Sequence, residues 1–147
     1  MSQVPAIGDS SFWPGKRIRS LDLSRNLISL IREEDFNGLP VLATLNLADN
    51  LLSSPPSAVF RRLVNLTRLS LARNRLTRLV PRLFYKLDRL EHLDLSENPL
   101  QELLAEDLKD TRRLKSLLLA GCGLERMHSL VYQTLQGLQV GRRLSSP

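Results

Sequence analysis

Three residues of this chain have side chains that could together perform nucleophilic catalysis: Ser70, His92 and Asp94. In serine hydrolases a histidine takes the proton of the serine hydroxyl, and a carboxylate orients the imidazole. His92 and Asp94 are two residues apart, which places them on one face of a strand, and Glu91 beside them could add a metal ligand. Whether this cluster is a site depends on the elements that position it.

An internal repeat of 24 residues indicates which secondary-structure elements position the cluster. Each unit fits LxxLxLxxNxL, with Ile at the first and last positions of the first unit and Cys for Asn in the last unit, and an apolar column, mostly Phe, follows in phase. The units start at 18, 42, 66, 90 and 114 and read IRSLDLSRNLI, LATLNLADNLL, LTRLSLARNRL, LEHLDLSENPL and LKSLLLAGCGL. Each LxL predicts a short strand, and the period predicts that strands stack in parallel. One unit cannot bury its leucines alone, so the stack itself forms the core.

These units resemble the leucine-rich repeat family, specifically its 24-residue typical class. NGLPVLATLNLADNLL and YKLDRLEHLDLSENPL match that class almost letter for letter, and the resemblance extends from residue 18 to about residue 137. It implies an α/β solenoid: a curved horseshoe with a parallel β-sheet on its concave face and irregular or short helical convex segments. It also implies binding through the concave face and a hydrogen-bonded ladder inside the turns. At the matching positions that structural ladder comprises Asn26, Asn50, Asn74, Asn98 and Cys122.

The repeat divides the chain into three parts. We expect residues 1–17 to form a partial repeat or a minimal N-terminal cap, and residues 18–137 to hold the five units. Residues 138–147 are expected to be a degenerate tail, because Gly141 occupies the place of the second Leu in a unit that would start at Leu138. Terminal units need a cap over their leucines, and the Cys-rich caps common in extracellular members of the family are missing. We therefore expect the chain to be a fragment of a larger secreted or cell-surface protein.

Composition narrows the function further. The 147 residues suit one domain, and the net charge of +6, from 21 basic and 15 acidic side chains, favours acidic partners. No apolar run approaches the roughly 18 residues of a membrane span, and the first residues do not read as a signal peptide. Cys122 is the only cysteine, so no internal disulfide can form. At its ladder position we expect Cys122 to be buried and unreactive.

Side chains at positions 3 and 5 of each unit point out of the concave face and are expected to contact a partner. The predicted partner-binding residues are Arg19, Asp22, Arg68, Ser70, Glu91, His92 and Asp94. Arg68 is the expected anchor, because arginine concentrates interface energy and this face has no aromatic side chain. An open sheet face offers neither a pocket nor oxyanion donors, so we expect no catalysis, no metal site and no cofactor.

Basic residues concentrate between residues 61 and 89, where Asp88 is the only acid. They fit either a solvated convex face or a patch for a polyanion such as a glycosaminoglycan, and the patch comprises Arg61, Arg62, Arg75, Arg78, Arg82, Lys86 and Arg89. Nucleic acid is not expected, because its binders interleave aromatic with basic side chains, and here the Phe column points inward and leaves only Tyr85. The sequon NLT marks Asn65, just before a strand, as an exposed glycosylation candidate.

Together these features favour a non-enzymatic module that binds a protein ligand through its concave face, as part of an extracellular recognition protein. Two alternatives stay open: an intracellular leucine-rich repeat adaptor, and a polyanion-binding protein that uses the basic patch. The resemblance implies an extracellular or cell-surface location if the chain belongs to a longer protein, and a chain complete as given would be cytoplasmic.

Overall fold

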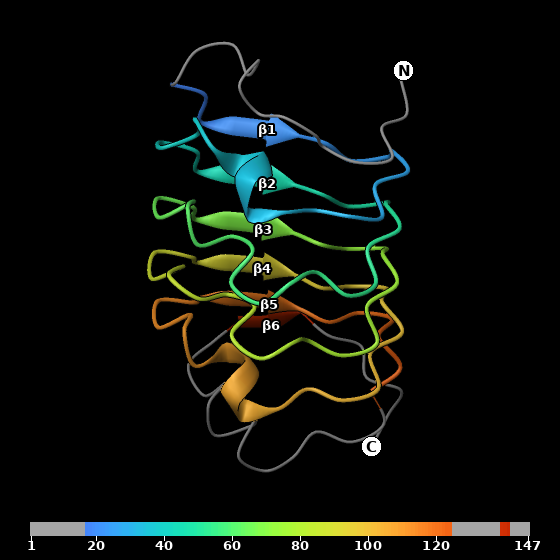
Figure 1. Ribbon diagram of the computed structural model, residues 1–147. Coiled ribbons are helices and arrows are strands. Elements are labelled where there is room, and N and C mark those ends of the chain that lie inside the picture. The colour runs from blue at the N-terminus through green and yellow to red at the C-terminus, as the bar shows by residue number, and fades with distance from the viewer. Residues whose placement is uncertain (1–16, 125–138, 142–147) are drawn as a thin grey trace.

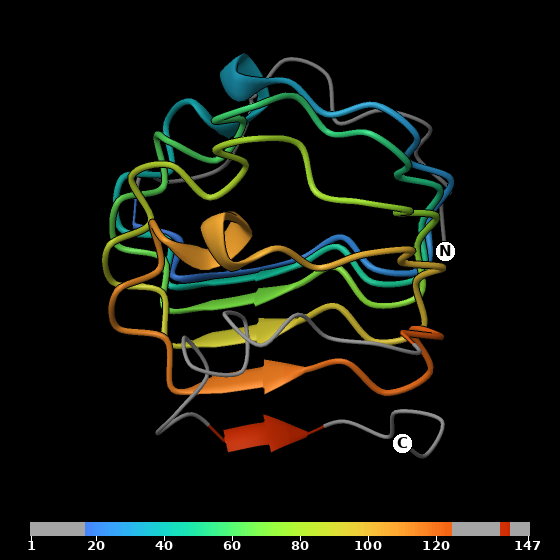
Figure 2. The same ribbon diagram turned by 90° about the horizontal axis from the view of Figure 1, so that it is seen from below.

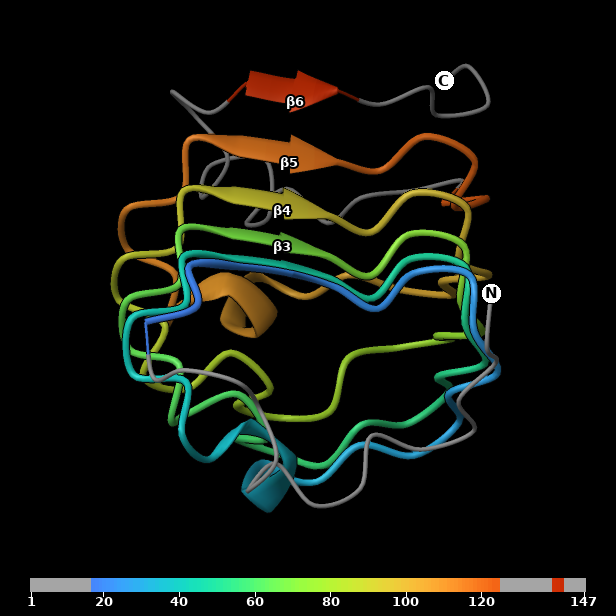
Figure 3. The same ribbon diagram turned by 90° about the horizontal axis from the view of Figure 1, so that it is seen from above.

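Six short parallel strands form one sheet, in the order β1-β2-β3-β4-β5-β6 (Figure 1). The computed structural model describes residues 17–124 and the backbone of residues 139–141. The strands are β1 (Ser20–Asp22), β2 (Thr44–Asn46), β3 (Arg68–Ser70), β4 (His92–Asp94), β5 (Ser116–Leu118) and β6 (Gln139–Gly141). Figures 2 and 3 show the strands along one side of the stacked coils and the return segments along the other. The predicted solenoid with a parallel sheet is confirmed. The expected partial repeat or cap at the N-terminus lies almost entirely outside the described residues.

The register of the sheet follows the 24-residue repeat from β1 to β5. Ser20 lies opposite Thr44, and the same step continues through the next three strands. The step to β6 is one residue shorter, because Ser116 pairs with Gln139 and Leu117 with Val140. The sixth unit is therefore shifted by one residue from the expected start at Leu138. Residues 139–141 add a sixth strand to the sheet, and most of the expected degenerate tail lies outside the described residues.

Leucine and phenylalanine columns fill the interior of the stack. The middle residue of β2 to β5 is a buried leucine in every case, and Phe36, Phe60 and Phe84 form the opposite wall. The rings of Phe36 and Phe60 are 5.7 Å apart between centroids. Burying each such side chain contributes about 1.5–3 kcal/mol, and the gain is available only when a neighbouring coil covers it.

The convex segments adopt two conformations, and the residue type at one position of the repeat differs between the two. The first and fourth coils contain short 3-10 helices, η2 (Glu33–Phe36) and η3 (Ala105–Leu108). Asp35 and Asp107 accept the backbone N–H groups of Arg32 and Leu104, at 2.8 and 2.7 Å, and so cap these helices. The same position holds an apolar side chain, which cannot cap a helix, in the second and third coils. Those two coils turn instead through prolines and a left-handed residue.

Buried asparagine side chains link each coil to the one before it. Asn74 donates its Nδ2 hydrogens to carbonyl groups of its own turn and to Leu47 of the preceding coil, at 3.0 Å. Its Oδ1 accepts the N–H of Leu52, also at 3.0 Å. Asn50 and Asn98 make the corresponding bonds. Asn26, at the start of the described region, donates within its own turn and is half-buried.

Cys122 takes the ladder position of the fifth coil. Its Sγ donates to the Leu95 carbonyl at 3.1 Å, and its side chain is 2% exposed. A thiol is a weak acceptor and does not replace the asparagine oxygen. The N–H of Leu100, which the repeat would direct to this side chain, donates to the Asn98 carbonyl at 2.8 Å instead. Burial raises the pKa of the Cys122 thiol.

A second set of side chains closes the turn that follows each strand. Oδ1 of Asp22, Asn46 and Asp94 accepts the N–H two residues further on, each at 2.9 Å, and Ser70 Oγ does so at 3.4 Å. Hydrogen bonds from the hydroxyl and backbone N–H of Ser24 lower the pKa of Asp22. Three residues after each of these side chains the backbone is left-handed, at Arg25, Asp49, Arg73 and Glu97. In the fifth coil Leu118 offers no oxygen, and a glycine, Gly121, occupies the left-handed position.

We predict that Cys122 is unreactive in the folded chain, because it is buried and its thiolate is disfavoured. A chromogenic disulfide reagent should label it many-fold more slowly in native buffer than in denaturant. Equal rates in the two conditions would mean that the thiol is accessible, contrary to its place in the ladder.

We also predict that the turn oxygen of Asp94 contributes to stability. Asp94→Ala should lower the free energy of unfolding by about 1 kcal/mol, the usual size of one lost hydrogen bond. Asp94→Asn keeps the oxygen and should retain most of that stability. Urea unfolding of the two variants measures the difference, and an equal loss in both would show that the charge matters rather than the bond to Ser96.

Candidate partner-binding site

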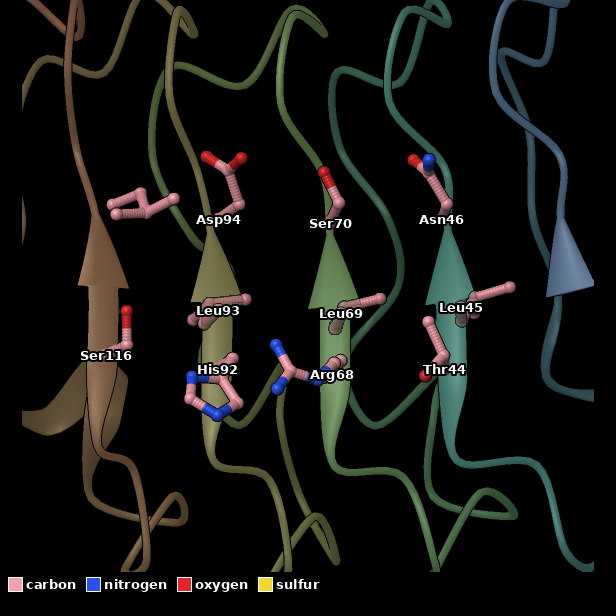
Figure 4. Close-up of a pocket in the computed structure, with 11 residues that line it drawn as sticks. Thr44, Leu45, Asn46, Arg68, Leu69, Ser70, His92, Leu93, Asp94 and Ser116 are labelled. Atoms are coloured by element: carbon pink, nitrogen blue, oxygen red, sulfur yellow. The ribbon is translucent and has the colours of Figure 1, made fainter. Parts of the chain in front are cut away.

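The concave face of β2 to β5 is hollowed into a shallow groove of about 230 Å³ (Figure 4). This corrects the expectation of a face without a pocket. The groove is lined by Thr44, Leu45, Asn46, Arg68, Leu69, Ser70, His92, Leu93, Asp94, Ser116 and Leu118. Of the predicted binding residues, Arg68, Ser70, His92 and Asp94 meet here, whereas Arg19, Asp22 and Glu91 do not line it.

The polar side chains of the groove lie in two rows across the strands. The donor row, at position 3 of the units, comprises Thr44, Arg68, His92 and Ser116. The cap row, at position 5, comprises Asn46, Ser70, Asp94 and Leu118. Figure 4 shows Arg68 and His92 at the amino ends of their strands and Asn46, Ser70 and Asp94 at the carboxyl ends. Thr44, Asn46, Ser116 and Leu118 were not predicted as binding residues, although they share the columns that identified the others.

Arg68 presents an uncompensated charge to the groove. Its side chain is exposed and forms no ion pair or hydrogen bond with any residue in the described range 17–124. Its neighbours on the adjacent strands are Thr44 and His92, and neither carries a negative charge. The guanidinium is therefore available to a group from outside the chain.

Charged residues beside the donor row, unlike Arg68, contact one another. Glu91 Oε1 lies 3.5 Å from Lys115 Nζ and 4.0 Å from His92 Nε2. Glu91 therefore interacts with its own neighbours, which explains why it does not act as an acid of the groove. Asp94 holds its turn through Ser96, but its carboxylate still places a negative charge at the carboxyl edge of the groove.

Ser70, His92 and Asp94 do not assemble into a catalytic group. No hydrogen bond connects His92 to Ser70 or Asp94 in the described structure, and Figure 4 shows His92 and Asp94 at opposite ends of β4. Ser70 Oγ and Asp94 Oδ1 instead accept backbone N–H groups of their turns. A nucleophile and its base must lie within hydrogen-bond reach, so this arrangement offers no activated serine. Among residues 17–124, no three His, Cys, Asp or Glu side chains converge as metal ligands.

On the flank beyond the cap row, charges at position 8 pair with one another. Arg73 Nε lies 2.8 Å from Asp49 Oδ1, and its Nη1 lies 3.2 Å from Glu97 Oε2. These hydrogen bonds raise the pKa of Arg73 above its ordinary value. Exposed pairs of this kind contribute a few tenths of a kcal/mol each, and they leave Arg73 without a free charge for a ligand.

The predicted basic patch is divided by acidic residues from neighbouring coils. Arg61 and Arg62 both contact Glu33, the latter at 3.2 Å. Arg82 makes two bonds of 3.1 Å to Asp110.

Other members of the patch are arranged around Tyr85. The Arg82 guanidinium lies 4.5 Å from the centre of the Tyr85 ring, and Lys86 Nζ lies 5.4 Å from it. Arg75 and Arg78 are exposed and form no ion pair with a described residue. The patch is therefore a mixture of paired and free cations.

Asn65, the glycosylation candidate, is half-buried, whereas an exposed side chain was expected. Its Nδ2 donates to the Pro40 carbonyl at 2.7 Å, and its Oδ1 accepts from Arg89 Nη1 at 2.7 Å. Thr67, which completes the sequon, donates to the Ala43 carbonyl at 3.1 Å. A glycan on Nδ2 would leave one hydrogen for Pro40, so the geometry is compatible with modification.

Many solved structures resemble this one, among them the following two. A chain of the TLR13-ssRNA13 complex has 24% sequence identity and a TM-score of 0.72, over 96% of this chain and 24% of that chain. A chain of the octameric complex of latrophilin 3, Unc5D and FLRT2 (LRR) has 22% identity and a TM-score of 0.82, over 97% of this chain and 44% of that one. The present chain therefore spans less than half of either, and identities this low establish the fold alone.

No curated protein matches the sequence. Within the described residues, no helix has the length and hydrophobicity that a bilayer span requires. A family model described as Leucine rich repeat matches residues 3–52, 40–100 and 64–124. These matches extend from residue 3 to residue 124 and include all the coils described between residues 17 and 124, so the chain belongs to the leucine-rich repeat family.

Proposed function

We propose that this chain is a non-enzymatic module that binds a protein partner through the groove on its concave face. The observation that carries the proposal is the exposed, unpaired guanidinium of Arg68 in the groove. By contrast, Arg73 on the flank of the groove and Lys115 beside the donor row both contact acids. A free arginine with fixed neighbours is the kind of residue that concentrates interface energy.

A protein ligand fits this groove better than a polyanion does. A glycosaminoglycan needs several free cations in a row, and the donor row has one arginine between Thr44 and His92. The lining also includes Leu118, whose side chain is 37% exposed. A mixed surface with the opposite charges of Arg68 and Asp94, several hydroxyl or amide groups and leucine side chains resembles the composition of a protein interface.

The solved relatives illustrate the two classes of ligand that this fold accepts. One of these structures is a complex of TLR13 with a single-stranded RNA, and the other contains FLRT2 (LRR) with latrophilin 3 and Unc5D. Single-stranded nucleic acids are bound by aromatic platforms as well as by cations. No aromatic side chain lines this groove, which supports a protein ligand here.

We further propose that the protein acts outside the cell. The sequon at residues 65–67 supports this placement, because Asn65 is accessible enough to carry a glycan without losing its bond to Pro40. The intracellular adaptor is the alternative, and in that compartment Asn65 would stay unmodified.

Arg68→Glu should abolish binding to the partner, because it replaces the free cation of the groove by a carboxylate. The test is a binding screen of the full chain against arrayed extracellular protein domains, in which every hit is measured again with Arg68→Glu and with the control Arg75→Glu. Arg75 is equally exposed but lies outside the groove lining. We expect at least about a tenfold loss, or about 1.4 kcal/mol, for Arg68→Glu alone.

Two outcomes contradict this assignment. Hits that bind Arg68→Glu as tightly as the original chain would remove the groove as the binding surface. Hits that are weakened by Arg75→Glu and displaced by heparin would support the polyanion alternative. Both variants should keep the circular dichroism spectrum and melting temperature of the original chain, because neither arginine contacts a described acid.

The glycosylation proposal has its own measurement. Expressed behind a secretion signal in animal cells, the chain should show a mass shift that peptide N-glycosidase removes. Asn65→Gln and Thr67→Ala should each eliminate the shift, because both destroy the sequon. A secreted chain of unmodified mass would refute modification at Asn65.

A further inference from the structure

We propose that the groove recognises an extended peptide segment with one acidic and one large apolar side chain, the carboxylate held by Arg68 and His92 and the apolar side chain packed on Leu118. The inference rests on the proposed function and specifies the chemistry of the partner. It follows from three features of the groove: the hydrogen-bond donors of the donor row, the negative charge of Asp94 in the cap row, and the presence of Leu118 where earlier coils have a polar side chain.

The donor row has no anionic acceptor of its own. Arg68 has only donor groups, and the hydroxyls of Thr44 and Ser116 have no hydrogen-bond partner in the described residues. His92 lies beside Arg68 on the next strand and can donate a ring N–H. A carboxylate matches this set, because its two oxygens can accept a guanidinium pair while a neighbouring donor satisfies a remaining lone pair.

The cap row fixes the orientation of that carboxylate. Asp94 lies two residues from His92 along β4, with its charge at the opposite edge of the groove. A ligand carboxylate is repelled there and attracted at Arg68. The oxygens of Asn46 and Ser70 already accept N–H groups of their turns. The cap row contains no cation that could bind a carboxylate.

Leu118 breaks the pattern of the cap row. Every earlier coil places a turn-capping oxygen at this position, and Leu118 caps nothing. The turn is formed without it, because Gly121 adopts its φ of 69° without the steric penalty of a side chain. The exposed leucine thus has no role in its own turn, and covering it with an apolar side chain of a partner is favourable.

The two anchor points have a spacing that a peptide can satisfy. His92 and Leu118 lie on neighbouring parallel strands and two residues apart along them, which gives a diagonal of about 8 Å from a strand separation of about 4.8 Å and a rise of about 6.6 Å. In an extended peptide, side chains two residues apart point the same way and are separated by roughly 6.6 Å. The expected segment therefore has an Asp or Glu and a large apolar residue separated by one residue.

Selection from a random peptide library tests this inference with the full chain. Displayed dodecapeptides are panned on the original chain, enriched peptides are synthesised, and their affinities are measured by fluorescence polarisation. We expect the enriched set to carry an acid two residues from Leu, Ile, Met or Phe. Arg68→Gln and Leu118→Ser should each weaken these peptides at least tenfold.

Matched controls come from the chain itself. Arg75→Gln removes an exposed arginine outside the groove lining, and Leu104→Ser removes a leucine that is 40% exposed and also lies outside it. Neither should change peptide affinity. Equal losses with the control variants would mean that the peptides bind by general charge or hydrophobicity, which overturns the proposal.

The remaining outcomes separate this inference from the proposed function. Enriched peptides without an acid, peptides indifferent to Arg68→Gln, or no enrichment above a library panned on empty support each overturn the acid-and-apolar motif. The function itself still stands if protein hits from the domain array depend on Arg68. If those hits do not depend on Arg68, both fail.

Discussion

The buried asparagine ladder is the interaction on which the rest of the structure depends. Asn50, Asn74 and Asn98 each donate to carbonyl groups of two successive coils and accept one N–H from the earlier coil. A buried polar group without a hydrogen-bond partner lowers the stability by about 1–3 kcal/mol. A coil shifted by one residue would leave several polar groups of the ladder unpaired at once. The leucine columns favour stacking in general, whereas the ladder fixes the register of the stack.

Because the register is fixed, residues at the same repeat position lie side by side across the strands and form a row on the surface. The residue types at that position determine whether the row forms ion pairs or leaves a charge unpaired. Position 8 carries acids on both sides of Arg73, so its charges bind one another and support the stack. Position 3 carries Thr44 and His92 on either side of Arg68, so the same spacing leaves that charge free. One geometric rule thus produces both a row of ion pairs on the flank and a row with an unpaired charge in the groove.

The sequence was sufficient for features that depend on spacing alone. The 24-residue period predicted the sheet, its parallel register through β5 and the phenylalanine wall. It did not predict the contacts between Glu33 and Arg61, because these depend on how neighbouring convex segments bend. That bending follows from Asp35, whose capping role becomes visible only with the helix in place. The groove was missed because its depth comes from side-chain packing, which a pattern of positions does not measure.

In the fifth coil, the residue at position 5 does not have to cap the turn that follows the strand. Earlier coils need an oxygen at position 5 because a residue with a side chain occupies the left-handed position three residues later. With Gly121 at that position the turn forms unaided, and position 5 is free to hold Leu118. The thiol of Cys122 makes the same coil depart from the ladder, and Leu100 bonds to the Asn98 carbonyl in compensation. The coil that departs most from the repeat pattern is therefore the one that contributes Leu118, the exposed leucine of the groove lining.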